Sequence, residues 1–309
     1  MAEISAKAVM DLRAKTGCGM MECKKALVEA NGDFEEAIKI LREKGLAVAA
    51  KKADRIAADG IVDILTVGNT SAILEVNSET DFVAKNATFK DFVKGVLETI
   101  VEKKPKSIEE LLALPYKDSD ATVDAALKNM IFTIGENMNI RRFEIVEGVV
   151  GTYIHGGGAA GVITKFETTN GIEKTAGFAE FAKNICMQIA AMNPLYVSKD
   201  HVPASVLESE KEILRTQIEN DEKLKSKPDA VKQKMVEGRI SKFYDTNCLL
   251  DQQYVKDEEI KVSKYVENTA KELGGEIKVV SFVKYEKGEG IEKKEDNFAE
   301  EIDKLVKGN

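Results

Sequence analysis

The chain repeats one order of segments, and this repetition limits the folds open to it more than any other feature. Two apolar stretches at 61–67 and 71–76, joined by Gly68-Asn69, read as a β-hairpin and precede a strongly amphipathic helix that begins at Ala87. A second hairpin is predicted at 149–154 and 162–167, again before a helix. Recurrence in the same order predicts two copies of one folding unit.

The two predicted copies also share motifs in their helices and last strands. Residues 178–183 (FAEFAK) echo 89–94 (FKDFVK), and residues 274–282 (GGEIKVVSF) echo 135–143 (GENMNIRRF). Each copy therefore reads hairpin–helix–strand, and a charged helical insertion at about 204–245 interrupts the second copy. The predicted fold class is α+β, with a core of two repeated antiparallel β/α subdomains.

Residues 1–45 predict three short helices. Ser5 is positioned to cap the first helix, and Asp33 with Glu36 has the spacing of a capping box for the third. Gly45 is expected to end that helix. So small a bundle resembles the ubiquitin-associated (UBA-like) type of three-helix module, which is a binding fold. Residues 46–59, rich in Ala and Lys, predict a helical linker.

We therefore expect four parts along the 309 residues. They are a UBA-like three-helix domain and linker (1–54), a core N-subdomain (55–147), a core C-subdomain carrying the inserted helical hairpin (148–285), and a C-terminal module with a helix (286–309). The insertion is helical on both sides of Lys227-Pro228, which predicts a projecting antiparallel hairpin. Its apolar stripe either seals only the hairpin or also docks a second molecule.

Charge and composition exclude several classes of protein. The net charge of −8 argues against non-specific nucleic-acid binding, which needs a basic surface. No apolar stretch approaches the length of a membrane span, and no signal peptide opens the chain, so a cytoplasmic protein is expected. The four cysteines show no ligand or disulfide spacing and are expected to be reduced and packed as small apolar side chains.

Two motifs resemble sites of nucleotide binding or catalysis, but the neighbouring sequence lacks the elements that such sites need. Residues 156–161 (GGGAAG) match GxGxxG, but a strand-like stretch follows where pyrophosphate binding needs a helix N-terminus. His155 with residues 156–158 looks like an esterase oxyanion loop, yet the chain has no GxSxG elbow. With only two histidines and no metal-ligand spacing, we expect no covalent catalysis, no cofactor and no metal site.

The junction at 75–86 joins a predicted strand to the next helix and has two interpretations. In one, Ser78 or Thr80 caps the helix, Glu79 or Asp81 complements the helix dipole, and Phe82 is a staple into the core. In the other, Asp81 and Phe82 protrude together, an acid beside an aromatic ring, as an interface hot spot. The local pattern alone favours the cap and staple.

Longer motifs favour the second interpretation. Leu12-Arg13 with residues 16–27 (TGCGMMECKKAL), and residues 75–86 (EVNSETDFVAKN), resemble the two signatures of the translation elongation factor Ts family. Residues 135–137, 140–142, 153–155 and the 286–300 segment also fit. The resemblance covers the whole chain and implies a guanine-nucleotide exchange factor, which binds GDP-loaded elongation factor Tu and releases GDP so that GTP can load.

The resemblance also implies roles for particular residues. Four would dislodge the magnesium ion of the partner: Thr80, Asp81, Phe82 and Val83. Six more would contact the same partner: Arg13, Met20, Met21, Ile134, Gly135 and His155. A C-terminal helix at about 292–307 would pack on the same partner. The resulting complex would be able to dimerise. The chain departs from the family at 156–160, where a basic residue and Ile give way to Gly and Ala.

Two rival hypotheses belong to other classes of protein. A binding adaptor would use the N-terminal bundle to recruit a ubiquitin-like or other helical partner without nucleotide exchange. An esterase would hydrolyse a generic ester in a reaction that depends on His155.

Overall fold

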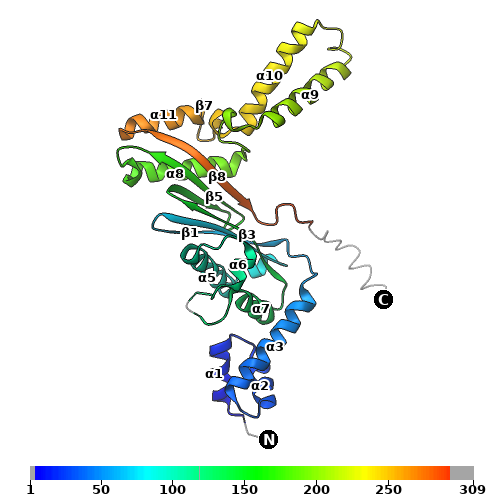
Figure 1. Cartoon of the computed structure of the whole chain (residues 1–309), viewed down its shortest axis with the longest axis vertical. Coiled ribbons are helices and arrows are strands. Elements are labelled where there is room, and N and C mark those ends of the chain that lie inside the picture. The colour runs from blue at the N-terminus through cyan, green and yellow to red at the C-terminus, as the bar shows by residue number, and fades with distance from the viewer. Residues whose placement is uncertain (1–3, 118, 293–309) are drawn as a thin grey trace.

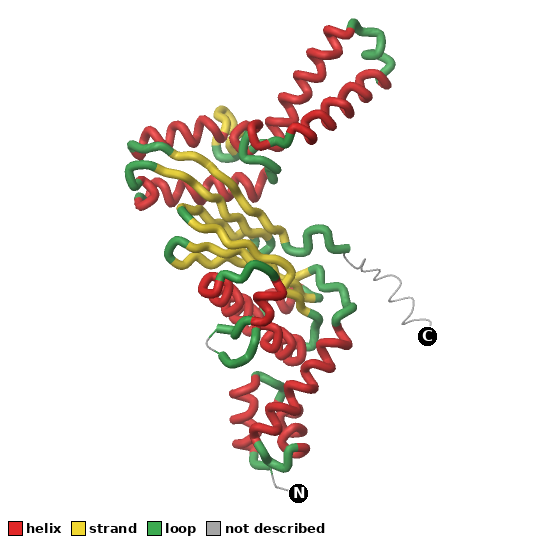
Figure 2. The backbone as a smooth tube through the Cα atoms, viewed as in Figure 1, coloured by secondary structure: helices red, strands yellow, loops and turns green. Residues whose placement is uncertain are grey.

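The computed structural model describes residues 4–117 and 119–292 as an elongated molecule (Figure 1). A three-helix bundle lies at one end, two β-sheets with their helices form the middle, and a helical arm projects at the other end (Figures 1 and 2). The prediction of helices combined with antiparallel sheets is confirmed. The C-terminal helix predicted at about 292–307 lies outside the described residues.

The N-terminal bundle consists of α1 (Ala6–Thr16), α2 (Met20–Glu29) and α3 (Phe34–Lys52). The predicted caps form: Ser5 Oγ accepts the Ala8 N–H at 3.2 Å, and Asp33 Oδ1 accepts the Glu36 N–H at 2.9 Å. Buried apolar residues from all three helices, Leu12, Cys23, Leu27 and Leu41 among them, form one small core.

The prediction that Gly45 ends the third helix is wrong, because α3 continues to Lys52 and includes most of the expected linker. Gly45 is buried within the helix, and a Cβ added there would lie 3.7 Å from Phe132 Cβ on helix α7. The position is thus an ordinary packing contact between two helices, without the left-handed backbone of a terminating glycine.

The first sheet has the strand order β1-β2-β3 and is antiparallel. Its strands are β1 (Asp59–Val67), β2 (Thr70–Ser78) and β3 (Met138–Glu147). Between β2 and β3 lie α4 (Asp81–Lys85), α5 (Ala87–Lys103), α6 (Ile108–Ala113) and α7 (Val123–Ile134). The predicted turn at Gly68-Asn69 and the helix beginning at Ala87 are confirmed, and α5 packs its apolar face on β1 and β2.

The second sheet has the corresponding order β4-β5-β8. Its strands are β4 (Val149–His155), β5 (Ala160–Thr168) and β8 (Ile277–Glu286), and α8 (Ala176–Met192) lies where the sequence predicts a helix. Both middle strands carry an irregularity in register, after Glu75 and after Lys165. Both last strands follow a helix that ends on a left-handed glycine, Gly135 or Gly274.

The sequence analysis made no prediction for residues 246–273, where the structure has β6 (Gln253–Tyr254), β7 (Asp257–Lys261) and α11 (Val262–Leu273). Strand β6 has two residues, too few for a periodic pattern. Most residues of α11 are polar, and its buried side chains are Val262, Val266 and Thr269. Three short 3₁₀ turns are also present: Ile172–Lys174, Lys199–His201 and Leu249–Asp251.

The two sheets pack face to face, with their helices on the outer sides (Figure 1). The shared layer contains Val62, Ile73, Ile163 and Tyr285. Strand β2 is buried along its whole length because α5 covers one face and the second sheet covers the other. A Cβ added at Gly161 would lie 2.7 Å from Val62 Cγ1, so this position keeps the sheets in close contact.

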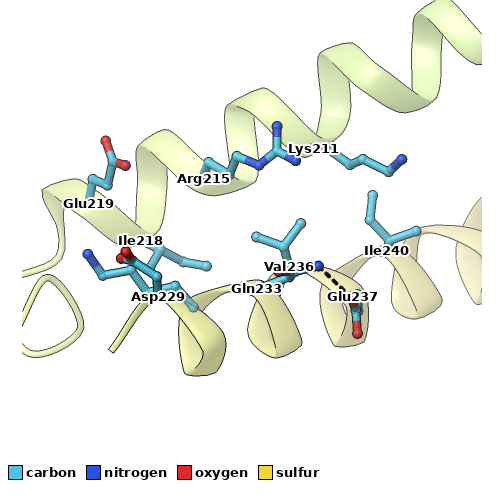
Figure 3. Close-up of a pocket in the computed structure, with 10 residues that line it drawn as sticks. Lys211, Arg215, Ile218, Glu219, Asp229, Gln233, Val236, Glu237 and Ile240 are labelled. Carbon is cyan, nitrogen blue, oxygen red and sulfur yellow. Dashed lines mark hydrogen bonds between the residues drawn. The ribbon is translucent and has the colours of Figure 1, made fainter. Parts of the chain in front are cut away.

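The predicted helical hairpin is an arm made of α9 (Ala204–Asn220) and α10 (Asp229–Asn247). Leu214 and Ile218 of α9 pack against Val236 and Ile240 of α10, so most of the apolar stripe seals the arm itself. Figure 3 shows Val236 and Ile240 pointing toward α9, beside an open groove of about 440 Å³. No helix in the described parts of the chain is long and apolar enough to cross a membrane.

A buried carboxylate fastens the end of the second sheet to the first. Glu75 of β2 has no exposed surface, and its Oε1 accepts the Gly288 N–H at 2.7 Å and Asn77 Nδ2 at 3.0 Å. Arg141 Nη1 and Arg142 Nε bond the two carboxylate oxygens at 3.0 and 2.6 Å. Burial raises the pKa of Glu75, but these hydrogen bonds outweigh it and leave the pKa below its ordinary value.

We predict that Glu75→Gln lowers the free energy of unfolding at pH 7 by about 3 kcal/mol, because both arginines lose a buried partner. A depressed folded-state pKa stabilises the protein above the ordinary value of 4.5 and stops doing so as the pH falls through the folded-state value. The difference between the two proteins should therefore shrink below pH 4.5. Urea unfolding across pH measures it, with the exposed Glu102→Gln as control; a difference independent of pH would contradict the assignment.

Candidate functional site

The 80–83 corner lies where β2 leaves the first sheet and a five-residue helix, α4, begins. Thr80 occupies the N-cap position of α4 with an extended backbone. Asn86 is extended as well, and its Oδ1 accepts the Thr88 N–H at 2.8 Å, so it ends α4 and starts α5. The short helix is therefore a distinct projection between a strand and a long helix.

Phe82 points away from the protein. Its exposed fraction of 79% is the largest among the exposed large hydrophobic residues of the described chain. The next two residues, Val83 and Ala84, are buried against the core of the first sheet. The staple interpretation of Phe82 is therefore wrong, because Val83 takes the inward position and Phe82 the outward one.

Asp81 and Lys85 form an ion pair beside that ring. Asp81 Oδ2 lies 2.6 Å from Lys85 Nζ, one helical turn away, and Lys85 Nζ lies 5.9 Å from the centre of the Phe82 ring. The hydrogen bond from Lys85 lowers the pKa of Asp81, and the same bond raises the pKa of Lys85. An anionic carboxylate and an aromatic ring thus occupy one exposed projection.

Ile134 and Gly135 lie next to this corner. Helix α7 ends at Ile134, which packs partly on the core, and Gly135 takes the left-handed backbone with φ of +87°. The following residue, Glu136, bonds the backbone N–H and the hydroxyl of Thr80. The structure therefore brings together the corner and the two residues that the family resemblance associates with it.

His155 ends β4 and lies beside the start of β1. The Val62 N–H donates to the Gly158 carbonyl at 2.9 Å, and a Cβ on Gly158 would lie 3.0 Å from Ile61 Cβ. The glycine-rich tip thus serves close backbone approach, and the GxGxxG match precedes strand β5 in place of a helix. The tip contacts the first half of β1, and the first residue of β1, Asp59, pairs with Ser78, the last residue of β2. The tip therefore lies toward the end of the first sheet from which the corner departs.

The imidazole of His155 is exposed and is hydrogen-bonded through Nδ1 to the Tyr153 hydroxyl at 3.0 Å. A phenol is a weak nucleophile and no esterase elbow accompanies it. Within residues 4–117 and 119–292, no group of three His, Cys, Asp or Glu side chains is placed to hold a metal ion.

Arg13, Met20 and Met21 lie apart from the corner, on the exposed surface of α1 and α2. Asn129 of α7 holds this bundle, because its Nδ2 donates to the Thr16 carbonyl at 3.0 Å and its Oδ1 accepts from Cys18 Sγ at 3.6 Å. Helix α7 thus touches the bundle and ends about 7.5 Å further on, beside the corner.

The corner is fixed by Glu79, Glu136 and Asn137. The sequence pattern offers Glu79 only as a helix-dipole partner and assigns no role to Glu136 or Asn137. Glu79 Oε1 accepts the Asn137 N–H at 2.6 Å, and Glu136 accepts two bonds from Thr80. All three lie inside motifs that carry the family resemblance. The motifs were the available signal, but residues 56 or more positions apart cannot be paired from one sequence.

Comparison with known proteins gives one consistent result. The family model described as "Elongation factor TS" matches residues 79–289. Proteins named elongation factor Ts are similar over nearly their whole length: 46% identity in Syntrophotalea carbinolica (99% of this chain, 100% of the relative), 48% in Clostridium kluyveri (99% and 99%) and 49% in Clostridium perfringens SM101 (98% and 99%).

We predict that Lys85→Met raises the pKa of Asp81 toward its ordinary value, because the carboxylate loses its hydrogen-bond donor. Carbon-detected NMR titration of the Asp81 carboxyl measures the change. Lys25→Met, which removes the partner of Glu22 on α2, is the matched control and should leave Asp81 unchanged. An Asp81 pKa that is equal in the wild type and in Lys85→Met would show that the ion pair does not persist in solution.

Proposed function

The chain belongs to the elongation factor Ts family, and we propose that its 80–83 corner is the part that displaces GDP from the partner GTPase. The family's role is guanine-nucleotide exchange on elongation factor Tu in translation, and this chain is such an exchange factor. It binds the GDP-loaded GTPase and promotes GDP release so that GTP can load.

The exposure of Phe82 beside Asp81 is the observation that carries the proposal. An aromatic side chain left 79% exposed loses the favourable transfer from water that burial would give, about 2 kcal/mol. Burial in a partner recovers this free energy. Exposed aromatic residues that become desolvated at an interface are typical binding hot spots.

Asp81 supplies the charge for the proposed mechanism. As its lowered pKa keeps it anionic, it can attract the magnesium ion held by the GTPase or repel the ion's ligands. Displacing that ion weakens the hold on GDP. Thermodynamic linkage then requires GDP to weaken binding of the factor by an equal ratio, with about 1.4 kcal/mol for each tenfold.

The corner residues divide between two proposed roles. Asp81 and Phe82 make the contacts with the GTPase, since they are the outward pair. Thr80 and Val83 anchor the corner from inside, as their hydrogen bonds and burial indicate. This differs from the role that the resemblance gives all four residues, which is direct displacement of magnesium.

Further contacts are proposed for residues of three other regions. Ile134 and Gly135 would extend the surface of the corner, and His155 would enter another pocket of the partner from the same end of the sheet. Arg13, Met20 and Met21 would bind the nucleotide domain of the GTPase from the helical bundle. Exchange by these contacts requires no covalent step and no cofactor.

We also propose the four-part division at 1–54, 55–147, 148–285 and 286–309. The end of α3 at Lys52, the repeated strand order and the equivalent glycines Gly135 and Gly274 support it. The arm offers Ile213, 49% exposed, as an apolar contact for a second molecule. Light scattering of the factor alone and with its partner tests whether that contact forms a dimer.

We predict that Phe82→Ala slows GDP release by about thirtyfold, and that Asp81→Ala with Phe82→Ala slows it further, because a hot-spot side chain contributes about 2 kcal/mol or more. Release of fluorescent GDP from elongation factor Tu measures the rate by stopped flow. The control is Val67→Ala, an exposed apolar residue at the opposite end of β1, which should exchange at the wild-type rate.

An unchanged rate in the double variant would exclude the corner as the displacing element. The adaptor hypothesis makes a different prediction in the same assay, since an adaptor that recruits a ubiquitin-like or other helical partner would not accelerate GDP release. The esterase hypothesis requires ester hydrolysis that His155→Ala abolishes.

A further inference from the structure

Two glutamates cross between the 80–83 corner and the junction that follows α7. Glu136, in the segment after α7, bonds Thr80 of the corner. Glu79, the residue just before the corner, bonds Asn137 of the same segment. We infer that Glu136, assisted by Glu79, is a positioning residue for nucleotide exchange: it fixes the backbone from which Asp81 and Phe82 project. The inference rests on the proposed function of the corner.

Glu136 uses both carboxylate oxygens on a single residue. Its Oε2 accepts the Thr80 N–H at 3.0 Å and its Oε1 accepts the Thr80 hydroxyl at 2.7 Å. The Thr80 carbonyl accepts from Ser78 Oγ at 3.0 Å. Every polar group of Thr80 is therefore bonded, and the residue cannot rotate without breaking charge-assisted hydrogen bonds.

Thr80 is the pivot of the projection. Its backbone is extended, at φ −127° and ψ 157°, and the next residue begins α4. A rotation at Thr80 would swing the whole short helix, together with Asp81 and Phe82. Holding Thr80 therefore holds the direction in which the exposed pair points.

Residues 135–137, which make these bonds, are also bonded to the chain at the end of α3. Asn137 is buried, and its Nδ2 donates to the carbonyls of Arg55 at 2.7 Å and Ala53 at 3.3 Å, just after α3. Lys52 Nζ donates to the Gly135 carbonyl. Three segments distant in sequence thus meet at one polar joint, which makes Glu136 a fixed point for the corner.

The Thr80 hydroxyl bonds Glu136 and does not cap its own helix, so this bond positions the corner and does not stabilise the start of α4. An N-cap threonine typically accepts an amide hydrogen of its own helix, which stabilises the helix start. In this protein α4 has no side-chain cap, and the Thr80 hydroxyl donates to Glu136. The bond orients the corner while leaving the start of α4 uncapped.

A fixed corner lowers the cost of complex formation. A projection that sampled many directions would lose conformational entropy when Phe82 entered its pocket on the GTPase. The joint removes that freedom before binding. Its loss should therefore act on exchange only through Asp81 and Phe82.

A double-mutant cycle in the GDP-release assay tests this inference with full-length factor. Glu136→Ala should slow release by about tenfold, and Thr80→Val, which removes only the hydroxyl, by a smaller factor. In an Asp81→Ala and Phe82→Ala background, Glu136→Ala should slow release by less than twofold, since both side chains that it positions are gone. The matched control is Glu102→Ala, a carboxylate on the exposed side of α5, which should exchange at the wild-type rate.

A merely structural role would give a different pattern, with equal losses from Glu136→Ala in both backgrounds, and would overturn the inference. A wild-type rate for Glu136→Ala would overturn it as well. Should Glu136→Ala fail to fold, Glu136→Gln, which keeps one acceptor oxygen, replaces it in the same cycle. The same results then support or overturn the inference. If the Asp81→Ala and Phe82→Ala double variant itself exchanges at the wild-type rate, the proposed function fails and the inference falls with it.

Discussion

Val62 and Ile73 from one sheet and Ile163 and Tyr285 from the other form a single apolar layer at the centre of the molecule. Each such side chain, buried from water, contributes about 1.5–3 kcal/mol, so the two sheets are held as one body. The glycines at 158 and 161 allow β5 and its tip to approach β1 closely. As a consequence His155 lies at the end of the first sheet from which the 80–83 corner departs, and the buried Glu75 fastens the chain after β8 to the same sheet.

The corner illustrates how an exchange factor can act without reactive groups. Its inner residues, Thr80 and Val83, are held by hydrogen bonds and by the core, which leaves Asp81 and Phe82 no inward alternative. The exposed ring is unfavourable in the free protein and favourable in a complex. Binding free energy gained in this way can oppose the binding of nucleotide to the GTPase, which linkage requires of any exchange factor.

Helices with complete local signals could be predicted from the sequence. Asp33 caps α3 as its spacing predicts, and the repeated phenylalanine pairs lie on α5 and α8 as expected. Local sequence does not show that Gly45 lies inside α3, since the helix packs there on Phe132, which is 87 positions away. Helix α11 carries Val262, Val266 and Leu273 at helical spacing, so the signal for this helix was present in the sequence.

The candidate site could likewise be predicted only in part from the sequence. Local pattern favoured Phe82 as a core staple, and only the longer motif indicated an exposed contact. The bonds from Glu136 to Thr80 and from Asn137 to Glu79 join positions 56 and 58 residues apart. Such pairs depend on the packing of α7 beside the first sheet, which the sequence does not encode in any periodic pattern.

Photo-crosslinking from position 82 tests the central claim most directly. With p-benzoylphenylalanine in place of Phe82, an aromatic group is retained at the exposed position, and the same group in place of Val67 serves as the reference. We expect crosslinks to elongation factor Tu from position 82 and not from position 67, and their loss when excess GDP and magnesium are added. Absence of crosslinks from position 82 in a complex that still forms would contradict the claim.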